Sequence, residues 1–142
     1  MSYVMVPFKR WHVDFLMEKG NTEGTAFRPD ETTLKLMESA ENSWTLVWGA
    51  DPVACGGTTE VWAGRHLAWM LISKSAAPHM LAITRHVKAC LERVQGRVEL
   101  TVRQDFQAGH RWATMLGFAV ETPLLAAYGS AGEDHVGYVL FR

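Results

Sequence analysis

The sequence predicts a single mixed α/β domain, residues 1–142, built on a central sheet of about seven strands. The chain has 142 residues, which is the size of one ordinary domain. Apolar residues make up 48% of it and charged residues 20%, a composition typical of a globular protein with a packed core. Apolar side chains recur every three or four positions in some segments and every second position, or without interruption, in others. Helices and strands therefore alternate along the chain.

The N-terminal part predicts one strand and two short helices. Residues 3–6 are an apolar segment that the proline at position 7 ends, as in a strand. Residues 8–20 have helical spacing, with that proline at a permitted helix start and a final glycine as the C-cap. Residues 21–28 are expected to form a loop. A second helix covers residues 30–40, and its first residue, Asp30, is suited to be the N-cap.

The middle of the chain predicts an antiparallel meander of three strands. Residues 43–48 and 53–62 are rich in β-forming side chains, and a turn that contains proline separates them. The pair Gly56 and Gly57 within the second strand predicts a bulge or a bend. Residues 66–73 are an almost unbroken apolar run, typical of a strand that is covered on both faces.

A long helix and another strand follow the meander. Residues 78–94 place apolar side chains in steps of three and four, and Gly96 is expected to end the helix. Residues 97–103 alternate apolar and polar side chains, as in a half-buried strand. Two strands joined by a helix are normally parallel, with a right-handed crossover, so residues 66–73 and 97–103 are expected to pair in the same direction.

The C-terminal part predicts one more helix and a hairpin. Asp105 is expected to cap a helix that runs to residue 116, and Gly117 to be its C-cap. Residues 118–128 and 135–141 are expected to form the terminal hairpin around a glycine-containing turn. The complete predicted order is β-α-α-β-β-β-α-β-α-β-β.

Composition and charge argue against several classes of function. The chain has 14 Lys and Arg and 15 Asp and Glu, so its formal net charge of -1 supports neither nucleic-acid binding nor adsorption on an acidic membrane. No apolar run is long enough for a membrane span, and the charge order at the N-terminus is wrong for a secretory signal. We therefore expect a cytoplasmic protein.

The cysteines and histidines predict neither a disulfide scaffold nor a metal site. Two cysteines, Cys55 and Cys90, are too few for a disulfide framework, and two reduced, buried thiols are expected, with a single bridge as the alternative. His79 and His86 are seven residues apart on the long predicted helix, too far along its axis to share an ion. No metal is expected.

Residues 109–118 read Gly-His-Arg-Trp-Ala-Thr-Met-Leu-Gly-Phe, a helix that ends in Leu-Gly-Phe before the penultimate strand. This segment, together with the order of elements over nearly the whole chain, resembles the GNAT superfamily of acyl-CoA-dependent N-acyltransferases. Within the superfamily, the short strand pair, the glycines at 56 and 57 and the pair Arg111 and Trp112 are most similar to the small internal virion proteins of short-tailed phages.

The resemblance implies a binding site for acetyl-CoA where the two parallel strands separate. In the superfamily, free backbone amides of the first of these strands hold the pantetheine arm, and the pyrophosphate lies at the N-terminus of the next helix. It also implies that a backbone N–H of this strand stabilises the oxyanion during transfer of the acetyl group to an amine. The implied cofactor-binding residues are Met70, Leu71, Ile72, Ser73, Lys74, Ser75, Ala76, Ala77, His79 and Met80.

Two features depart from the superfamily's pattern. Its phosphate loop carries glycines, but residues 74–80 contain none, and Pro78 has no N–H to donate. Polar side chains of this segment could compensate, or the segment could simply cap a core helix. The position of the tyrosine that protonates the leaving thiolate in many members is Ala113 here. His110, Tyr128 or a water would have to be the acid instead.

The candidates for the general base are Glu60 at the end of one strand and His66 at the start of the next, although both residue types more often have structural roles. The implied acceptor pocket is formed by residues 21–29 and 129–134. Two functions stay open. One is transfer of an acetyl group from a coenzyme A donor to an unidentified amine. The other is a catalytically inactive phage protein of this fold, in the host cytoplasm or the virion, that acts through virion or homo-oligomer contacts.

Overall fold

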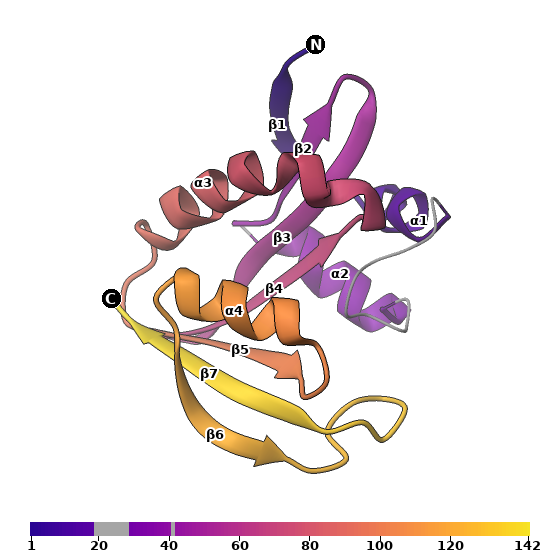
Figure 1. The fold of residues 1–142 in the computed structure, drawn as a ribbon. Helices are drawn as coiled ribbons and strands as arrows, with labels where there is room; N and C mark the ends of the chain where they lie inside the picture. Colours follow the sequence, from indigo (N-terminus) through magenta and orange to yellow (C-terminus); the bar gives the residue numbers. More distant parts are fainter. Residues whose placement is uncertain (19–28, 41) are drawn as a thin grey trace.

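The computed structural model describes residues 1–18, 29–40 and 42–142 of the chain. These residues form a seven-stranded mixed sheet with helices on both faces, which confirms the predicted fold class and order of elements (Figure 1). The strand order is β1-β2-β3-β4-β5-β7-β6. The elements are β1 Tyr3–Pro7, α1 Arg10–Glu18, α2 Glu31–Ser39, β2 Trp44–Trp48, β3 Asp51–Trp62, β4 Arg65–Ile72, the 3-10 helix η1 Lys74–His79, α3 Met80–Leu91, β5 Arg97–Arg103, α4 Gln107–Met115, β6 Ala119–Leu125 and β7 His135–Phe141.

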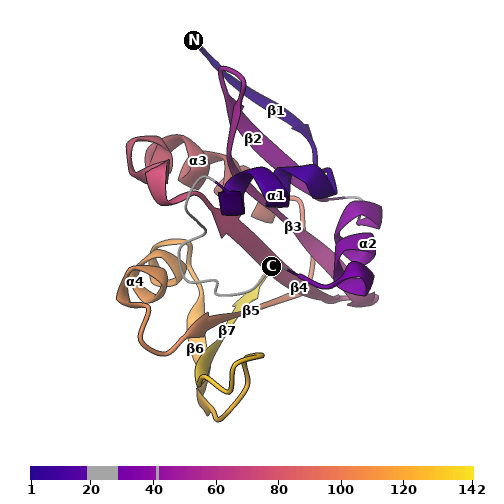
Figure 2. The ribbon, with the colours of Figure 1, turned by 90° about the vertical axis from the view of Figure 1, so that its right-hand side faces the viewer.

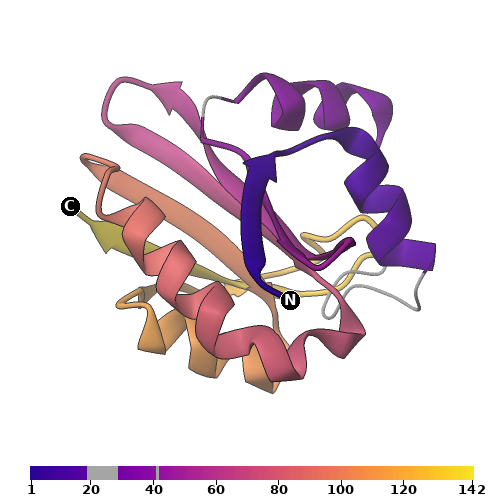
Figure 3. The ribbon, with the colours of Figure 1, turned by 90° about the horizontal axis from the view of Figure 1, so that it is seen from above.

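Different helices cover the two faces of the sheet. Seen from above, α3 and α4 lie on one side of the strands and α1 and α2 on the other, and the side view agrees (Figures 2 and 3). We call these sides the α3/α4 face and the α1/α2 face. In the part of the chain that the structure describes, no helix is long and apolar enough to cross a membrane.

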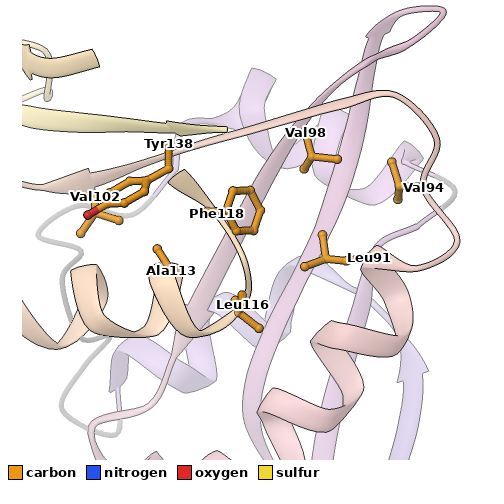
Figure 4. Packing of buried hydrophobic residues seen from close by; sticks show 8 residues of the cluster. All are labelled: Leu91, Val94, Val98, Val102, Ala113, Leu116, Phe118 and Tyr138. Atoms are coloured by element: carbon orange, nitrogen blue, oxygen red, sulfur yellow. The ribbon is translucent and has the colours of Figure 1, made fainter. Parts of the chain in front are cut away.

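Three clusters of buried apolar side chains hold the helices against the sheet. On the α3/α4 face, Ile83 of α3 packs with Trp44 and Leu46 of β2. On the α1/α2 face, Leu16 and Leu34 of the two helices belong to one cluster with side chains of β3 and β4. The cluster that joins α3, β5, α4 and β7, shown in Figure 4, consists of Leu91, Val94, Val98, Val102, Ala113, Leu116, Phe118 and Tyr138.

The strand pairings of the central sheet follow the predicted topology. The antiparallel pairs β2–β3 and β3–β4 form the predicted meander. The β4 and β5 strands are parallel, as a strand–helix–strand connection requires, and η1 and α3 form the crossover between them. The strands β6 and β7 form the predicted C-terminal hairpin, and β7 also pairs with β5.

The crossover begins and ends differently from the prediction. Residues 74–79, whose first part was expected to be a loop, form the 3-10 helix η1, and α3 covers Met80–Leu91 instead of residues 78–94. The Ser73 side chain caps η1 by accepting the backbone N–H of Ser75 at 3.1 Å. Pro78 lies inside η1, and α3 begins two residues later, at Met80.

The two adjacent glycines of β3 do not form a bulge, which was one of the two predicted alternatives. The β3 strand is continuous through Gly56 and Gly57, and the irregular pairings of this strand occur elsewhere. Close packing explains the glycines instead. A Cβ on Gly56 would lie 2.9 Å from the Trp44 ring, and one on Gly57 would lie 2.8 Å from the Cα of Ser43. Glycine permits this approach because it has no side chain.

The predicted helix ends are partly confirmed. Asp30 caps α2 by accepting the backbone N–H of Thr33 at 2.8 Å. Asp105 does not cap α4, because its carboxylate forms an ion pair with Arg103. Gly117 follows the end of α4 with φ of +99°, the left-handed conformation expected of a glycine C-cap. The proline at position 7 ends β1 and does not begin α1, and the predicted C-cap at position 20 and loop 21–28 lie outside the described residues.

Candidate active site

The parallel strands β4 and β5 stay paired only at their beginnings. The paired residues are Arg65 with Arg97, His66 with Val98, and Leu67 with Glu99. Beyond these positions the strands diverge, and the arrowheads of β4 and β5 point apart in Figure 1. Each strand keeps its other neighbour, since β3 pairs with β4 up to Ile72 and β7 pairs with β5 up to Arg103. The sheet thus contains a wedge-shaped opening between β4 and β5.

The edge of β4 beside this opening presents free backbone groups. The Ser73 N–H donates to the Val53 carbonyl of β3 at 3.1 Å. Backbone direction alternates along a strand, so Leu71 also faces β3, and the N–H and C=O groups of Met70 and Ile72 face the opening. Neither residue has a partner on β5. An extended ligand in the opening can therefore form hydrogen bonds with them as a strand would.

A cavity of about 680 Å³ occupies the opening, a size typical of small-molecule and cofactor sites. Val87 of α3 and Trp112 of α4 line it on the α3/α4 face. Trp69, Thr101 and His135 line it on the α1/α2 face, since their neighbours along β4, β5 and β7 point to the α3/α4 face. The cavity therefore reaches both faces through the opening in the sheet.

Most of the predicted cofactor-binding residues lie in this cavity wall. Leu71 instead packs into the core of the α1/α2 face, Ser75 bonds through its hydroxyl to Ser73, and His79 turns toward β1. The Tyr3 hydroxyl lies 2.7 Å from Nδ1 of His79. The predicted residues that line the cavity are Met70, Ile72, Ser73, Lys74, Ala76, Ala77 and Met80.

The segment η1 uses much of its hydrogen-bonding capacity internally. The N–H groups of Ser75 and Ala76 both donate to Ser73, and the N–H of Met80 donates to the carbonyl of Ala77. No side chain caps the N-terminus of α3, and the exposed Lys74 lines the cavity nearby. An anion at this end of the cavity would therefore interact with the Lys74 ammonium and the positive end of the α3 dipole more than with loop amides.

None of the four predicted catalytic residues lines the cavity, and Tyr128 is exposed. Glu60 is exposed on β3. His66 is buried at the closed end of the β4–β5 pair, where its Nε2 donates to the Gln95 carbonyl at 3.1 Å. Both ring nitrogens of His110 are engaged, Nε2 with the Gln104 carbonyl at 2.9 Å and Nδ1 with the Tyr138 hydroxyl at 2.7 Å. The structure does not bring these three side chains together.

A polar group that the sequence did not single out lies on the α1/α2 side of the cavity. His135 begins β7, and its Nε2 is 3.4 Å from Oε1 of Glu133. Its Nδ1 is 3.2 Å from Oγ1 of Thr101 on β5, and the ring of Tyr128, the fourth predicted catalytic residue, is 5.3 Å away between centroids. The Glu-x-His spacing of 133 and 135 is visible in the sequence, but only the β5–β7 pairing places Thr101 beside it.

Glu133 supplies a negative charge beside the His135 ring. Its own backbone N–H, the His135 ring and the N–H of Ala131 lower the pKa of the Glu133 carboxyl, and the Ala131 bond measures 3.0 Å. The carboxylate is therefore ionised at neutral pH. In its hydrogen bond with His135 it can act only as the acceptor, so the ring must be the donor. On the same face, the indole Nε1 of Trp69 is buried with no hydrogen-bond partner among the described residues.

The two cysteines are free thiols that differ in burial. Cys55 is fully buried in β3, and burial raises the pKa of its thiol. Cys90 is half-buried on α3, lines the cavity and has its Sγ 3.1 Å from Nε2 of His86. Burial raises the pKa of the Cys90 thiol and lowers that of His86, so both are neutral at neutral pH. Within the described ranges, no three His, Cys, Asp or Glu side chains are grouped to hold a metal ion.

A seven-stranded mixed sheet with this order, four α-helices and a parallel central pair that opens at one end is the GNAT fold. Three solved structures of this fold match nearly the whole chain. They are the ribosomal-protein-S18-alanine N-acetyltransferase of Escherichia coli (17% identity, TM-score 0.74, 98% of this chain and 93% of that one), Ard1 of Thermoplasma volcanium (12%, 0.76, 99% and 97%) and a GNAT-family acetyltransferase of Bacillus anthracis (9%, 0.67, 99% and 95%). No model of a known protein family matches the sequence, and no curated protein matches it either. At these identities the likeness shows the fold.

Proposed function

We propose that this protein binds acetyl-CoA in the opening between β4 and β5 and transfers the acetyl group to an amine. The observation that carries the proposal is the separation of the two strands after Leu67 and Glu99, which leaves Met70 and Ile72 without a partner on β5 beside a cavity of about 680 Å³. The similar solved structures support it, because those named above include an enzyme that acetylates the alanine of a ribosomal protein.

The residues of the cavity wall favour one orientation of coenzyme A in the cavity. The amides of the pantetheine arm pair with the backbone of Met70 and Ile72. The diphosphate lies toward the N-terminus of α3, where the Lys74 ammonium and the helix dipole attract it. The small side chains of Ala76 and Ala77 leave space for it.

The chemistry requires a polarised thioester and an amine on the other side of the sheet. Acetyl-CoA supplies an electrophilic carbonyl carbon and a thiolate leaving group. A backbone N–H of Met70 or Ile72 donates to the thioester oxygen and stabilises the negative charge that develops on it, a contribution of about 10²–10³ in rate for one such donor. The α3/α4 face holds the cofactor, so the acceptor amine enters from the α1/α2 face, where Trp69, Thr101 and His135 line the cavity.

A second candidate function is the same fold without catalysis. It is favoured by η1, which contains no glycine and uses N–H groups of Ser75, Ala76 and Met80 internally. It is also favoured by Ala113, a buried methyl group at the position where the resemblance implies a tyrosine. In this case the protein is a virion or morphogenesis component of a short-tailed phage that acts through contacts with itself or other virion proteins. The free thiols fit the reducing cytoplasm of a host cell under either function.

Ligand binding distinguishes the two functions. Acetyl-CoA and coenzyme A at a hundred times their Kd should each add roughly 2.7 kcal/mol of apparent stability in a thermal-shift measurement. Ala77 is exposed and lines the cavity, so A77E places a negative charge at the diphosphate position, while A77Q is the matched neutral control. A77E should weaken coenzyme A binding in calorimetry at least about tenfold relative to A77Q, a difference of about 1.4 kcal/mol. Absence of any shift at millimolar coenzyme A would exclude acetyl transfer and favour the second function.

A further inference from the structure

We propose that His135 is the general base of this acetyl transfer and removes a proton from the acceptor ammonium through its Nδ1. The inference rests on the proposed function and adds to it the residue that prepares the acceptor. It is carried by three observations: the placement of His135 in the cavity wall, the hydrogen-bond partners of its two ring nitrogens, and the way in which the other histidines are engaged.

The partners of the ring determine which nitrogen can accept a proton. The Glu133 carboxylate is ionised and accepts only, so Nε2, 3.4 Å from its Oε1, carries the hydrogen. In the neutral ring, Nδ1 then carries the lone pair. In the free protein the Thr101 hydroxyl, 3.2 Å away, donates to this lone pair, and an entering ammonium takes its place because the hydroxyl can rotate away. Nδ1 is thus an acceptor held in place, and the carboxylate stabilises the positive charge that protonation would create on the ring.

The position of His135 matches the side from which the amine arrives. His135 is paired with Arg103 at the end of β5, where β4 has already diverged, and both residues line the cavity on the α1/α2 face. The titratable and charged groups near the ring include Glu133, Tyr128, Arg103 and the adjacent Asp134; Arg103 is paired with Asp105, and Asp134 accepts the Ala127 N–H. The Glu133 carboxylate therefore also attracts a cationic acceptor.

The other histidines do not offer the same arrangement. The chain contains six histidines, and of these only His86 and His135 line the cavity. His86 belongs to the α3/α4 face, where its Nε2 contacts the Cys90 thiol at 3.1 Å and its ring packs edge-on against Trp44. This is the face assigned to the cofactor, so His86 is not placed to meet the amine.

The proposed step conserves atoms and charge. His135 Nδ1 takes one proton from the ammonium and becomes an imidazolium. The freed nitrogen lone pair attacks the thioester carbon, a C–N bond forms, and the carbonyl electron pair moves onto oxygen. The C–S bond then breaks as the carbonyl reforms, and the second proton of the nitrogen neutralises the departing thiolate through water. The imidazolium returns its proton to solvent, which leaves an acetamide and coenzyme A thiol.

The test compares two small amines of similar shape and different basicity. Ethylamine is almost fully protonated at neutral pH and needs a base, whereas 2,2,2-trifluoroethylamine is largely neutral and does not. With acetyl-CoA as donor, release of coenzyme A thiol is measured for the wild-type protein, H135Q and E133Q. H135Q should lower kcat/KM for ethylamine by about 10²–10⁴, as loss of a general base does, and should change kcat/KM for trifluoroethylamine by less than about tenfold. E133Q should also lower kcat/KM for ethylamine more than for trifluoroethylamine, but by a smaller factor than H135Q.

Two binding measurements separate failure of this inference from failure of the proposed function. Calorimetry with acetyl-CoA and a melting curve show whether H135Q is folded and binds the donor as the wild-type protein does. Equal losses for the two amines, or no loss, would overturn the base role and leave acetyl transfer standing. Binding of acetyl-CoA without transfer to either amine by the wild-type protein would also overturn the base role. No binding of acetyl-CoA at all would overturn the proposed function and this inference with it.

Discussion

Leu67 and Glu99 are the last paired residues of β4 and β5, and the Glu99 side chain forms ion pairs with arginines of both strands at this point. Its carboxylate lies 2.5 Å from Nε of Arg65 and 2.9 Å from Nε of Arg97. The bond with Arg65, and then that with Arg97, lower the pKa of Glu99 to about 2. Arg97 continues the network to Glu121 of β6. These ion pairs join the strands where the opening between them begins.

The first prediction concerns the stability that Glu99 provides. E99Q should lower the free energy of unfolding at neutral pH by about 1 kcal/mol, because it removes two charge-assisted bonds that are partly screened by solvent. The folded pKa of about 2 lies below the ordinary value of 4.5, so this contribution is complete above about pH 4.5 and is lost as the pH falls toward 2. Urea unfolding of both proteins across this range should show their stabilities converge. E121Q, at a more exposed site, should lower the free energy of unfolding by less than E99Q does. A difference in unfolding free energy between E99Q and the wild-type protein that does not change with pH would contradict this role of Glu99.

The second prediction concerns Gly96, which precedes β5 with φ of +99°. A Cβ at this position would lie 2.5 Å from the Gly64 carbonyl oxygen, the same oxygen that accepts the Arg97 N–H. G96A must therefore displace the backbone that starts the β4–β5 pair. Gly132 is the matched control, since its φ is +80° and a Cβ added there would have no neighbouring atom within 4 Å.

In thermal or urea unfolding, G132A should cost about 1–2 kcal/mol, the strain of a left-handed alanine. G96A should cost clearly more, because the clash adds to the same strain. Equal losses for the two variants would show that the approach of Gly64 and Gly96 places no constraint on the fold.

The sequence predicted the elements of the fold and the parallel direction of β4 and β5 well. Helical spacing and strand alternation are local, and the handedness of a strand–helix–strand unit leaves one arrangement for residues 66–73 and 97–103. The local geometry of glycines was harder to predict. Gly117 could be identified as a helix end because it follows a helical pattern, but Gly56 depends on the Trp44 ring of a neighbouring strand.

In the candidate site, too, the part that is local in the sequence could be predicted, and the part that depends on contacts between distant segments could not. The proposed cofactor side follows the chain continuously from β4 through η1 into α3, so a resemblance in element order is enough to locate Met70 and Ala77 in the cavity wall. The side proposed to meet the amine is assembled from separate strands. His135 and Thr101 are 34 residues apart and become neighbours only through the β5–β7 pairing. No periodicity within either segment indicates that contact.

The third prediction concerns the two thiols. Cys55 is fully buried with a pKa raised by burial, so it should not react with a thiol reagent such as DTNB while the protein is folded. Cys90 is half-buried in the cavity wall and should react slowly at neutral pH, because burial raises the pKa of its thiol as well. Saturating acetyl-CoA, whose sulfur is blocked as a thioester and does not react with DTNB, should slow that reaction further.

The time course of DTNB reaction should therefore show one thiol in the native protein and two after unfolding in urea. C90S should abolish the native reaction, and C55S should leave it intact. Two thiols that react at the same rate in the folded protein would contradict the assigned burial of Cys55. A Cys90 rate that is insensitive to bound acetyl-CoA would place the ligand away from α3.

The fourth prediction concerns His12 of α1, which is 3% exposed. Its Nδ1 accepts the Lys9 N–H at 3.0 Å and lies 2.7 Å from the Thr45 hydroxyl, so the folded state holds the neutral ring. Burial, and then the charge of Lys9, lower the pKa of His12 below its ordinary value of 6.5. The unfolded chain therefore binds an additional proton between the lowered pKa and about 6.5, and the stability that His12 confers is complete above that pH and is lost as the pH falls.

H12N keeps an acceptor oxygen near the Nδ1 position but cannot titrate. Its free energy of unfolding should change less between neutral pH and pH 5 than that of the wild-type protein, as urea unfolding at intervals across this range would show. His86, whose pKa burial also lowers, adds a similar slope in both proteins, so the difference between the two curves isolates His12. Parallel curves would mean that His12 becomes charged without opposing the fold, and that its bonds with Lys9 and Thr45 do not require the neutral ring.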